Sequence, residues 1–468
     1  MSPQARRLLA AVFLFLYAFG LRVTLLGKHP FHMDEALYAS FSQRILHGDL
    51  LLTGGMNNDK PPLQFYLGAV GMALFGDGES AIRAMNCLVS SLECAALCWF
   101  LWPLCGTLIS LMAGLLLAGA PLAAGYGASA LMDGPMSLFL LLAFCLAASS
   151  RPWAAGLAWG LACACKQTAW FLGPFLALTV WMAGFAPHSS LKQWAKGAAA
   201  ALVPLFIWSL LFQHPRLGMI FLMKANQPEV GHAWGGLGTR FAQWLAIGGS
   251  LYEPQALFAL ALWGGLAFSA FLAWRWRDDH ALRAWSLAGF FGPLCLLLFA
   301  ALNMRFFDRY LLPLASFGLM ALALGLAYVT RERRGLRLLL LPCMLLAVFA
   351  NRGLSLPPSQ EGVGFAANDG FDRVAALLKS RSPGGGKIFS NDGSVQWMSA
   401  YYLAKGWQVV EISDSHELMQ RLGAETGPEA WLLLRPGEAL LPPKGWNLDE
   451  SARLENWVLT RARRPAPK

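Results

Sequence analysis

Long apolar segments recur along the first three quarters of this 468-residue chain, and they constrain its fold more than any other feature. Most approach the ~20 residues that an α-helix needs to cross the ~30 Å apolar layer of a bilayer. They lie near residues 8–26, 81–101, 107–125, 131–149, 153–169, 170–186, 197–213, 254–274, 284–302, 310–329 and 336–351. Since 56% of the residues are hydrophobic and only 14% are charged, we expect a polytopic α-helical membrane protein with about 11 transmembrane helices.

Charged residues are distributed unevenly, which predicts two domains. Residues 1–351 hold 14 of the 27 acidic residues, and the much shorter segment 352–468 holds the other 13. We therefore expect a transmembrane domain over 1–351 and a soluble domain over 352–468. The net charge of +10 comes mostly from basic loops between apolar segments, so we expect a lipid bilayer and no nucleic acid as a partner.

The C-terminal segment alternates short strand-like and helix-like patterns. Strands are expected in GKIFSN, WQVVEI, AWLLLRP and NWVLTRA, and helices in GFDRVAALLKSR, SVQWMSAYYLAK and SHELMQRLG. This alternation predicts a small α/β domain with a partly parallel sheet. The glycine run at 384–386 precedes a strand and not a helix, so no nucleotide site is expected there. We therefore expect this domain to support the outer loops or to recognise the acceptor.

Basic residues in short loops predict the orientation of the helices. Arg6 and Arg7 precede the first apolar segment, which we interpret as an uncleaved signal anchor with these arginines inside. Counted from there, the alternate loops are basic near residues 151, 192–196, 275–283 and 331–337. The loops 27–80 and 214–253 and the segment 352–468 are then expected outside.

Ten of the 14 acidic residues before residue 352 fall on this predicted outer side, together with several cations. The acidic ones include Asp34, Glu35 and Asp133, and the cations are Lys60, Arg83, Lys166, Arg305 and Arg309. Ionisable groups at membrane depth are costly and are usually functional. The cluster therefore predicts an active site at the outer boundary between water and lipid, with ordinary charged helix ends as the alternative.

The loop 27–80 is long enough to hold structure of its own. A helix over 34–48 is expected, in which Asp34 caps the N-terminus and Glu35 favours the first turn. Two prolines follow Lys60 and begin a second short helix, so this lysine is held on a rigid corner at the level of the lipid headgroups. It can bind phosphate as a point charge, or it is a surface lysine whose ammonium merely reaches water.

Six short motifs follow one another in the membrane part of the chain. They are DEALYA at 34–39, KPP at 60–62, LFGDGESAIRAMN at 74–86, LMDGPMSLF at 131–139, GLACACKQTAWFLGP at 160–174 and DRYLLPLASFGLMAL at 308–322. In this order the set resembles the family of dolichyl-phosphate-mannose protein mannosyltransferases, and most of all its bacterial branch, which includes the lipid A aminoarabinose transferases. Two positions depart from the family pattern. Leu37 stands where relatives often carry arginine, and residues 58–60 are NDK where relatives often have FEK.

This resemblance implies a C-type glycosyltransferase architecture with an extracytoplasmic C-terminal domain. It also implies the inverting transfer of a sugar from a polyprenyl-phosphate donor to an envelope acceptor, which can be lipid A, another glycan or a protein. The reaction would take place at the periplasmic face of a bacterial inner membrane. A transporter or flippase, or a non-catalytic assembly partner for lipid-linked glycans, is the alternative. A transporter is expected to show internal repeats, which the sequence does not display.

The candidate site residues follow from this reaction. A phosphate leaving group needs fixed cations, and Lys60 is the first candidate. The acceptor hydroxyl needs a carboxylate base, for which we predict Asp34, while Glu35 or Asp133 orients the acceptor or the sugar. The other substrate-binding candidates are Tyr38, Arg44, Asp59, Arg83, Lys166, Arg305 and Arg309. Of these, Arg44 or Arg83 can supply the phosphate contact that Leu37 cannot make.

No cofactor is expected with certainty, but a divalent metal is an alternative. His29 and His32 flank the two adjacent carboxylates of Asp34 and Glu35, and the four side chains together can ligate a metal ion. Two histidines three residues apart in a loop are more often ordinary interfacial residues. We therefore assign no metal ligand.

The second long outer loop, 214–253, combines several glycines with an apolar stripe. Phe241, Trp244 and Leu245 predict a helix that lies at the membrane surface. We interpret the loop as a cover that becomes ordered when substrate binds, with a plain surface loop as the alternative.

Overall fold

The computed structural model of the chain describes residues 2–53, 60–184, 186–212, 236–248, 251, 263–275, 280–303, 307–331, 335, 342, 365–403, 406–438 and 444–464. The chain forms two compact units. The first comprises Met1–Leu26 and Arg44–Gln360, and the second comprises Gly27–Gln43 and Glu361–Lys468. The stretch 27–43 therefore belongs with the C-terminal segment. The predicted domain boundary at residue 351 lies outside the described residues.

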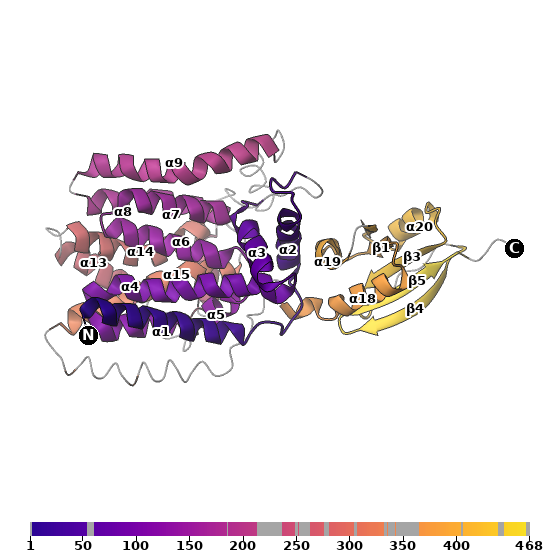
Figure 1. The fold of residues 1–468 in the computed structure, drawn as a ribbon, viewed down its shortest axis with the longest axis horizontal. Helices are drawn as coiled ribbons and strands as arrows, with labels where there is room; N and C mark the ends of the chain where they lie inside the picture. The colour runs from indigo at the N-terminus through magenta and orange to yellow at the C-terminus, as the bar shows by residue number, and fades with distance from the viewer. Residues whose placement is uncertain are drawn as a thin grey trace. The chain divides into compact units, whose positions relative to one another are not determined.

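The first unit is helical (Figure 1). Its α-helices are α1 (Pro3–Val23), α3 (Leu63–Phe75), α4 (Glu79–Gly119), α5 (Pro121–Gly127), α6 (Asp133–Ala148), α7 (Pro152–Cys165), α8 (Gly173–Ala183), α9 (Pro187–Phe212), α11 (Leu237–Gly248), α13 (Gly265–Arg275), α14 (His280–Ala301) and α15 (Leu312–Val329). Two 3-10 helices, η1 (Gln167–Leu172) and η3 (Asp308–Leu311), precede α8 and α15. Helix α2 (Met33–Leu46) begins in the second unit and ends in the first.

Several of these helices are long and apolar enough to cross a membrane. In the described part of the chain they are Glu79–Gly119, Pro187–Phe212 and Asp308–Val329, with a fourth if the bent pair Leu282–Phe290 and Leu294–Ala301 forms one span. Shorter apolar helices accompany them at Leu63–Phe75, Asp133–Ala148 and Pro152–Cys165. The predicted polytopic helical membrane protein is confirmed. The count of about 11 spans stays a prediction, and its last segment, 336–351, falls almost wholly outside the described residues.

Helix α4 contains the break that the sequence predicts between segments 81–101 and 107–125. Gly106 has a φ of 76° and a ψ of 175°, which interrupts the helix. Only glycine adopts such a backbone conformation without a steric penalty. Pro103, one turn earlier, lacks the N–H that a continuous helix would use. Two helical segments therefore follow each other where the sequence shows two apolar segments.

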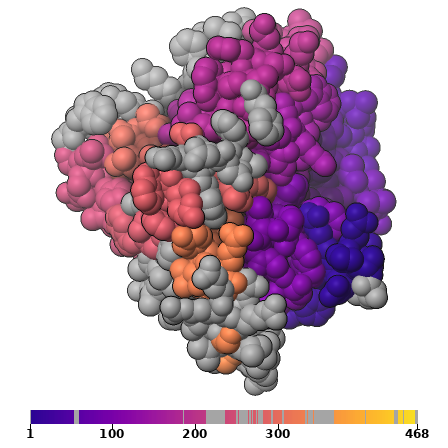
Figure 2. All heavy atoms as spheres, turned by 90° about the vertical axis from the view of Figure 1, so that its left-hand side faces the viewer, coloured from indigo at the N-terminus to yellow at the C-terminus, as the bar shows by residue number. Residues whose placement is uncertain are grey.

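Small residues allow close packing between neighbouring helices of this unit. Helices α7 and α9 lie side by side (Figure 1), and a Cβ added to Gly156 would lie 2.0 Å from the Trp194 carbonyl oxygen. At Gly197 the corresponding distance to the Trp153 oxygen is 1.9 Å. Such contacts are typical of helices that associate in a membrane. Figure 2 shows the end of the unit that carries the N-terminus, where α1 in indigo adjoins α4 in purple, while α13 and α14 in pink lie on the other side.

Buried polar side chains link the helices of the first unit. The carboxylate of Glu93 on α4 accepts hydrogen bonds from Ser137 on α6, at 2.7 Å, and from Ser316 on α15, at 2.9 Å. Arg22 at the end of α1 donates to Ser90 on α4, at 2.6 Å, and to the carbonyl of Ala118, at 3.3 Å. Polar groups in such helical cores are costly unless they are paired, so these bonds specify which helices meet.

The second unit contains a mixed five-stranded sheet in the order β2-β1-β3-β5-β4. The strands are β1 (Gly386–Ser390), β2 (Trp407–Glu411), β3 (Glu429–Leu434), β4 (Asn447–Leu454) and β5 (Trp457–Arg463). Strand β1 pairs in parallel with β2 and β3, whereas β5 pairs antiparallel with β3 and β4. The helical elements are η4 (Phe365–Asn368), α18 (Phe371–Arg381), α19 (Ser394–Tyr402) and α20 (Ser415–Gly423). The predicted α/β domain with a partly parallel sheet is confirmed, while β4 was not predicted.

The core of the second unit lies between α20 and the sheet. Leu418 and Leu422 of α20 are fully buried in one cluster with Phe389 of β1 and Leu432 of β3. Burial of each such side chain contributes about 1.5–3 kcal/mol to stability. Asp414 caps α20 by accepting the N–H of Glu417 at 2.9 Å, which fixes where the helix begins.

Candidate active site

The loop before α6 is held in place by amide side chains from two other helices. Asn86 of α4 donates to the carbonyl oxygens of Ser129, at 2.6 Å, and Leu131, at 2.7 Å. Gln64 of α3 donates to the oxygen of Asn86, at 3.0 Å, and to the carbonyl of Ala130, at 3.3 Å. Three consecutive carbonyls are thereby satisfied, and the start of α6 is fixed.

Asp133 is the first residue of α6, and its side chain is only 3% exposed. The ammonium of Lys166, which lies between α7 and η1, forms an ion pair with it and donates a hydrogen bond to Oδ1. The same ammonium lies 4.1 Å from the centre of the Tyr310 ring. An aromatic ring and a carboxylate together stabilise a buried cation. The structure therefore brings together two predicted site residues that are 33 positions apart in the sequence.

A second carboxylate lies next to Tyr310 in the sequence. Asp308 is buried and accepts a hydrogen bond from the Tyr126 hydroxyl at 2.5 Å and from the N–H of Arg309 at 2.8 Å. The Arg309 guanidinium lies 4.7 Å from the centre of the Phe307 ring. Tyr126, Asp308 and Tyr310 were not among the predicted site residues. The motif DRYLLP contains two of them, but nothing in the sequence pointed to Tyr126.

The remaining predicted cations of the first unit have different environments. Arg83 is fully buried, with its Nη1 3.7 Å from the Glu79 carboxylate. The guanidinium of Arg44 donates twice to Asp49, at 2.7 and 3.1 Å, so a phosphate would have to compete with this carboxylate. Lys60 is half-buried and immediately precedes the two prolines that lead into α3. Asp59 and Arg305, also predicted, lie outside the described residues.

The adjacent carboxylates Asp34 and Glu35 lie in the second unit, in the first turn of α2. Helix α2 begins at Met33, and the predicted cap at Asp34 is wrong. Glu35, which is fully buried, accepts the N–H of His32 at 2.9 Å, while the His32 ring nitrogen Nδ1 accepts the N–H of Asp34 at 3.2 Å. This arrangement resembles a capping box, but histidine replaces the usual serine or threonine and its ring accepts the N–H of the second helical residue instead of the third. Glu35 therefore stabilises the helix start, whereas the side chain of Asp34 is partly exposed.

The C-terminal segment anchors the chain just before this helix. The Tyr402 hydroxyl accepts the N–H of Phe31 at 3.0 Å, and the Phe31 ring packs 4.9 Å from Tyr401. His29 lies 3.2 Å from the carboxylate of Asp369. Within the described residues, no group of three or more His, Cys, Asp and Glu side chains is placed to hold a metal ion. Tyr38, another predicted site residue, is 5% exposed on α2. The predicted support of the first outer loop by the C-terminal domain has a structural basis in these contacts.

Helix α11 falls in the predicted cover, loop 214–253. The predicted helix is present, but its Trp244 is fully buried and packs 5.3 Å from Phe299 of α14. This side chain therefore belongs to the core of the first unit, and the location of the helix at the membrane surface stays a prediction. Residues 214–235, 249–250 and 252–253 of the loop lie outside the described residues, so the cover stays a prediction.

Comparison with known proteins identifies the fold. Residues 59–211 match the family model for dolichyl-phosphate-mannose-protein mannosyltransferases. The structure of ArnT from Cupriavidus metallidurans bound to undecaprenyl phosphate is similar with a TM-score of 0.65 and 16% identity, over 96% of this chain and 97% of that one. The chain has the fold of the C-type membrane glycosyltransferases. The predicted resemblance is thus confirmed, and the matched segment contains Lys60, Arg83, Asp133 and Lys166.

A more distant C-type glycosyltransferase has the same fold. An oligosaccharyltransferase from Archaeoglobus fulgidus, in complex with zinc and sulfate, matches with a TM-score of 0.57 and 13% identity, over 91% of this chain and 68% of that one. No curated protein matches this sequence significantly. At these identities the structural matches establish the fold, and the assignment of substrates depends on the site residues.

Proposed function

We propose that this C-type fold carries out the inverting transfer of a sugar from a polyprenyl-phosphate donor to an envelope acceptor, which can be lipid A, a glycan or a protein. The observation that carries the proposal is the similarity over almost the whole chain to a structure that holds undecaprenyl phosphate. The buried pair of Asp133 and Lys166, at two motif positions of the same family, supports it. The reaction is assigned to the periplasmic face of a bacterial inner membrane.

In the proposed mechanism, cations stabilise the leaving phosphate and one carboxylate acts as the base. Departure of the polyprenyl phosphate leaves negative charge on its oxygens, which fixed cations stabilise without any rearrangement. Lys60 is assigned to this phosphate, with Arg83, Lys166 and Arg309 as further sources of positive charge. Asp34 is assigned as the base that takes the proton from the acceptor hydroxyl, which then attacks the anomeric carbon from the face opposite the phosphate.

The experiment that tests this function measures sugar transfer by the purified chain. The protein is reconstituted in lipid nanodiscs with a polyprenyl-phosphate sugar and envelope extract, and the product is detected by mass spectrometry. Cleavage of the sugar–phosphate bond with transfer to an acceptor supports the proposal. Movement of the intact lipid across a bilayer without bond cleavage would instead identify a transporter, which is the main alternative.

We expect Lys60→Ala to weaken use of the donor. The variant loses one charge on the leaving phosphate but should still fold and insert, because this side chain is only half-buried. Lys60→Arg should recover activity only in part, since a planar guanidinium does not replace a compact ammonium. The measurement is transfer rate at limiting donor. A wild-type transfer rate in Lys60→Ala would show that this ammonium contacts water and does not bind the donor phosphate.

The predicted orientation is tested by cysteine labelling. The eight described cysteines are all buried, so introduced thiols should dominate the signal. Ser380 is exposed in the second unit. In intact spheroplasts, an impermeant maleimide should therefore label Ser380→Cys without lysis. Arg151→Cys, in the exposed turn between α6 and α7, should react only after lysis. Labelling of Arg151→Cys in intact spheroplasts would reverse the orientation and reject the periplasmic active site.

A further inference from the structure

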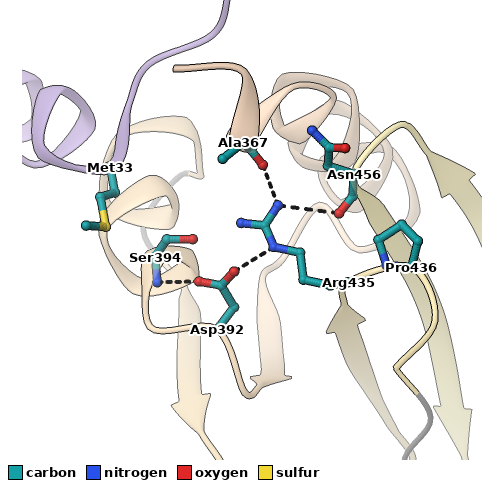
Figure 3. A pocket seen from close by; sticks show the side chains of 7 residues that line it. All are labelled: Met33, Ala367, Asp392, Ser394, Arg435, Pro436 and Asn456. Carbon is teal, nitrogen blue, oxygen red and sulfur yellow. Dashed lines mark hydrogen bonds and ion pairs between the residues drawn. The ribbon is translucent and has the colours of Figure 1, made fainter. Parts of the chain in front are cut away.

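The second unit contains a cavity of about 400 Å³ that the proposed reaction does not use (Figure 3). This volume falls within the ~300–1,000 Å³ typical of ligand pockets. Its lining residues are Met33, Ala367, Asp392, Ser394, Arg435, Pro436 and Asn456. A buried hydroxyl without a partner among the described residues, a guanidinium nitrogen with one long hydrogen bond and a balanced charge distinguish it from an ordinary surface hollow.

Arg435 is held rigidly on one side of the cavity. Its Nε donates to Asp392 at 2.7 Å, its Nη1 donates to the carbonyl oxygens of Ala367 and Asn456, and its guanidinium stacks on Trp457 at 3.7 Å. In the part of the chain that the structure describes, the Nη2 group has one acceptor, the side chain of Asn368 at a long 3.4 Å. Figure 3 shows this nitrogen pointing toward the middle of the cavity. A fixed donor is thus available to a ligand.

Ser394 supplies a second available group from the opposite side. Its side chain is 5% exposed, and its hydroxyl has no hydrogen-bond partner among the described residues. The hydroxyl points into the cavity in Figure 3, while the backbone N–H of the same residue is bound by Asp392 at 2.8 Å. A buried hydroxyl without a hydrogen-bond partner is energetically unfavourable. A ligand that both donates and accepts hydrogen bonds would remove this cost.

The charges that line the cavity select the chemical class of the ligand. One carboxylate, Asp392, faces one guanidinium, Arg435, so the lining has no net charge. Burial alone would raise the pKa of the Asp392 carboxyl, but the adjacent Ser394 and the charge of Arg435 hold that pKa below its ordinary value. A phosphate would therefore meet a carboxylate in the site. Hydroxyl groups suit these donors and acceptors, and Met33 and Pro436 offer apolar contact to the carbon face of a sugar ring.

We infer that this cavity binds a neutral, hydroxyl-bearing carbohydrate unit of the acceptor. The assignment to the acceptor rests on the proposed function, because Met33 directly precedes Asp34, the proposed base, on the same helix. The C-terminal domain then has two roles: it anchors the start of α2, and it holds the molecule whose hydroxyl Asp34 deprotonates.

The test measures binding of a panel of methyl glycosides to the full-length chain in nanodiscs by saturation-transfer NMR. One or more glycosides should bind the wild type, and Ser394→Ala should weaken that binding about 2–10-fold, the equivalent of one hydrogen bond. The matched control is Ser399→Ala. Ser399 is on the same helix, is also buried and also has a hydroxyl without a partner, but it does not line the cavity. Both variants should unfold at the wild-type temperature, since neither loses a hydrogen bond.

Three results would overturn the inference: no glycoside binds, both serine variants bind equally, or inorganic phosphate displaces the glycoside. The transfer assay separates this failure from failure of the proposed function. Transfer with no glycoside binding and an unchanged acceptor KM in Ser394→Ala would reject the cavity alone. Glycoside binding that depends on Ser394, without any sugar transfer, would retain the cavity and reject the glycosyltransferase activity.

Discussion

Turnover of the Asp34→Asn variant is expected to fall by about 10²–10⁴-fold, the usual contribution of a general base. The substitution keeps the shape of the side chain but removes the proton acceptor. The fold should be preserved, because asparagine has the same shape as aspartate and the backbone N–H of Asp34, which the His32 ring accepts at 3.2 Å, is unchanged. Binding of the polyprenyl phosphate should also persist, since cations and not this carboxylate are assigned to hold it. The measurement is single-turnover sugar transfer in nanodiscs, with donor binding followed in parallel.

The neighbouring Glu35 provides the matched control. Its carboxylate is fully buried and accepts the N–H of His32 at 2.9 Å. The amide oxygen of Glu35→Gln can accept the same hydrogen bond, so this variant should retain most of the turnover. Near-wild-type transfer by Asp34→Asn would reject the base and make Asp133 the next candidate. Simultaneous loss of donor binding and turnover would instead give Asp34 a structural role.

The capping of α2 shows where sequence patterns are sufficient and where they are not. Aspartate is a common N-cap, so the pattern HMDE favoured Asp34 over His32, which is not a usual cap. The structure uses His32 and Glu35, because glutamate three residues after the cap can reach back to its N–H. The existence of the helix was thus predictable from local composition, but its first residue depended on a histidine ring nitrogen that no propensity describes.

The strands of the C-terminal domain show a similar limit. Strands β1, β2, β3 and β5 were predicted from their apolar residues. Strand β4, NLDESARL, was missed because it is an edge strand rich in polar residues. It forms because β5 offers it an antiparallel partner, a tertiary interaction that the local sequence does not contain. Charged residues on such an edge also protect the sheet from pairing with other chains.

The candidate site depends on longer-range contacts. The family resemblance identified Asp133, Lys166 and Arg309 one by one, but the pairing of Asp133 with Lys166 required the folded structure. The hydrogen bond between Tyr126 and Asp308 joins residues 182 positions apart, and Tyr126 lies outside the quoted motifs. Residues inside a recognisable motif can therefore be found from the sequence. The side chains that pair with them depend on how the helices pack.

Separation of the buried ion pair should have the largest effect on stability. Asp133→Asn leaves the Lys166 ammonium buried without its carboxylate, and Lys166→Met leaves the carboxylate without its ammonium. Each change is expected to destabilise the protein by about 3–5 kcal/mol, because an uncompensated charge remains in a site almost closed to water. The double variant removes both charges of this pair and should recover most of that loss. The measurement is reversible unfolding of all four forms in detergent micelles.

Turnover of the same four forms separates a structural from a catalytic role for the pair. If Lys166 stabilises the leaving phosphate, the double variant should regain stability but remain about 10²–10³-fold slower than wild type, the usual cost of losing one preorganised charge contact. If the pair only holds α6 against η1, turnover should return together with stability, and Lys166 would no longer be assigned to the leaving phosphate.

Asp49→Asn is the control for partly exposed ion pairs. Its partner Arg44 is 22% exposed, so the loss of stability should be only about 0–1 kcal/mol. A loss as large as that of Asp133→Asn would mean that exposure does not determine the cost of breaking an ion pair in this protein.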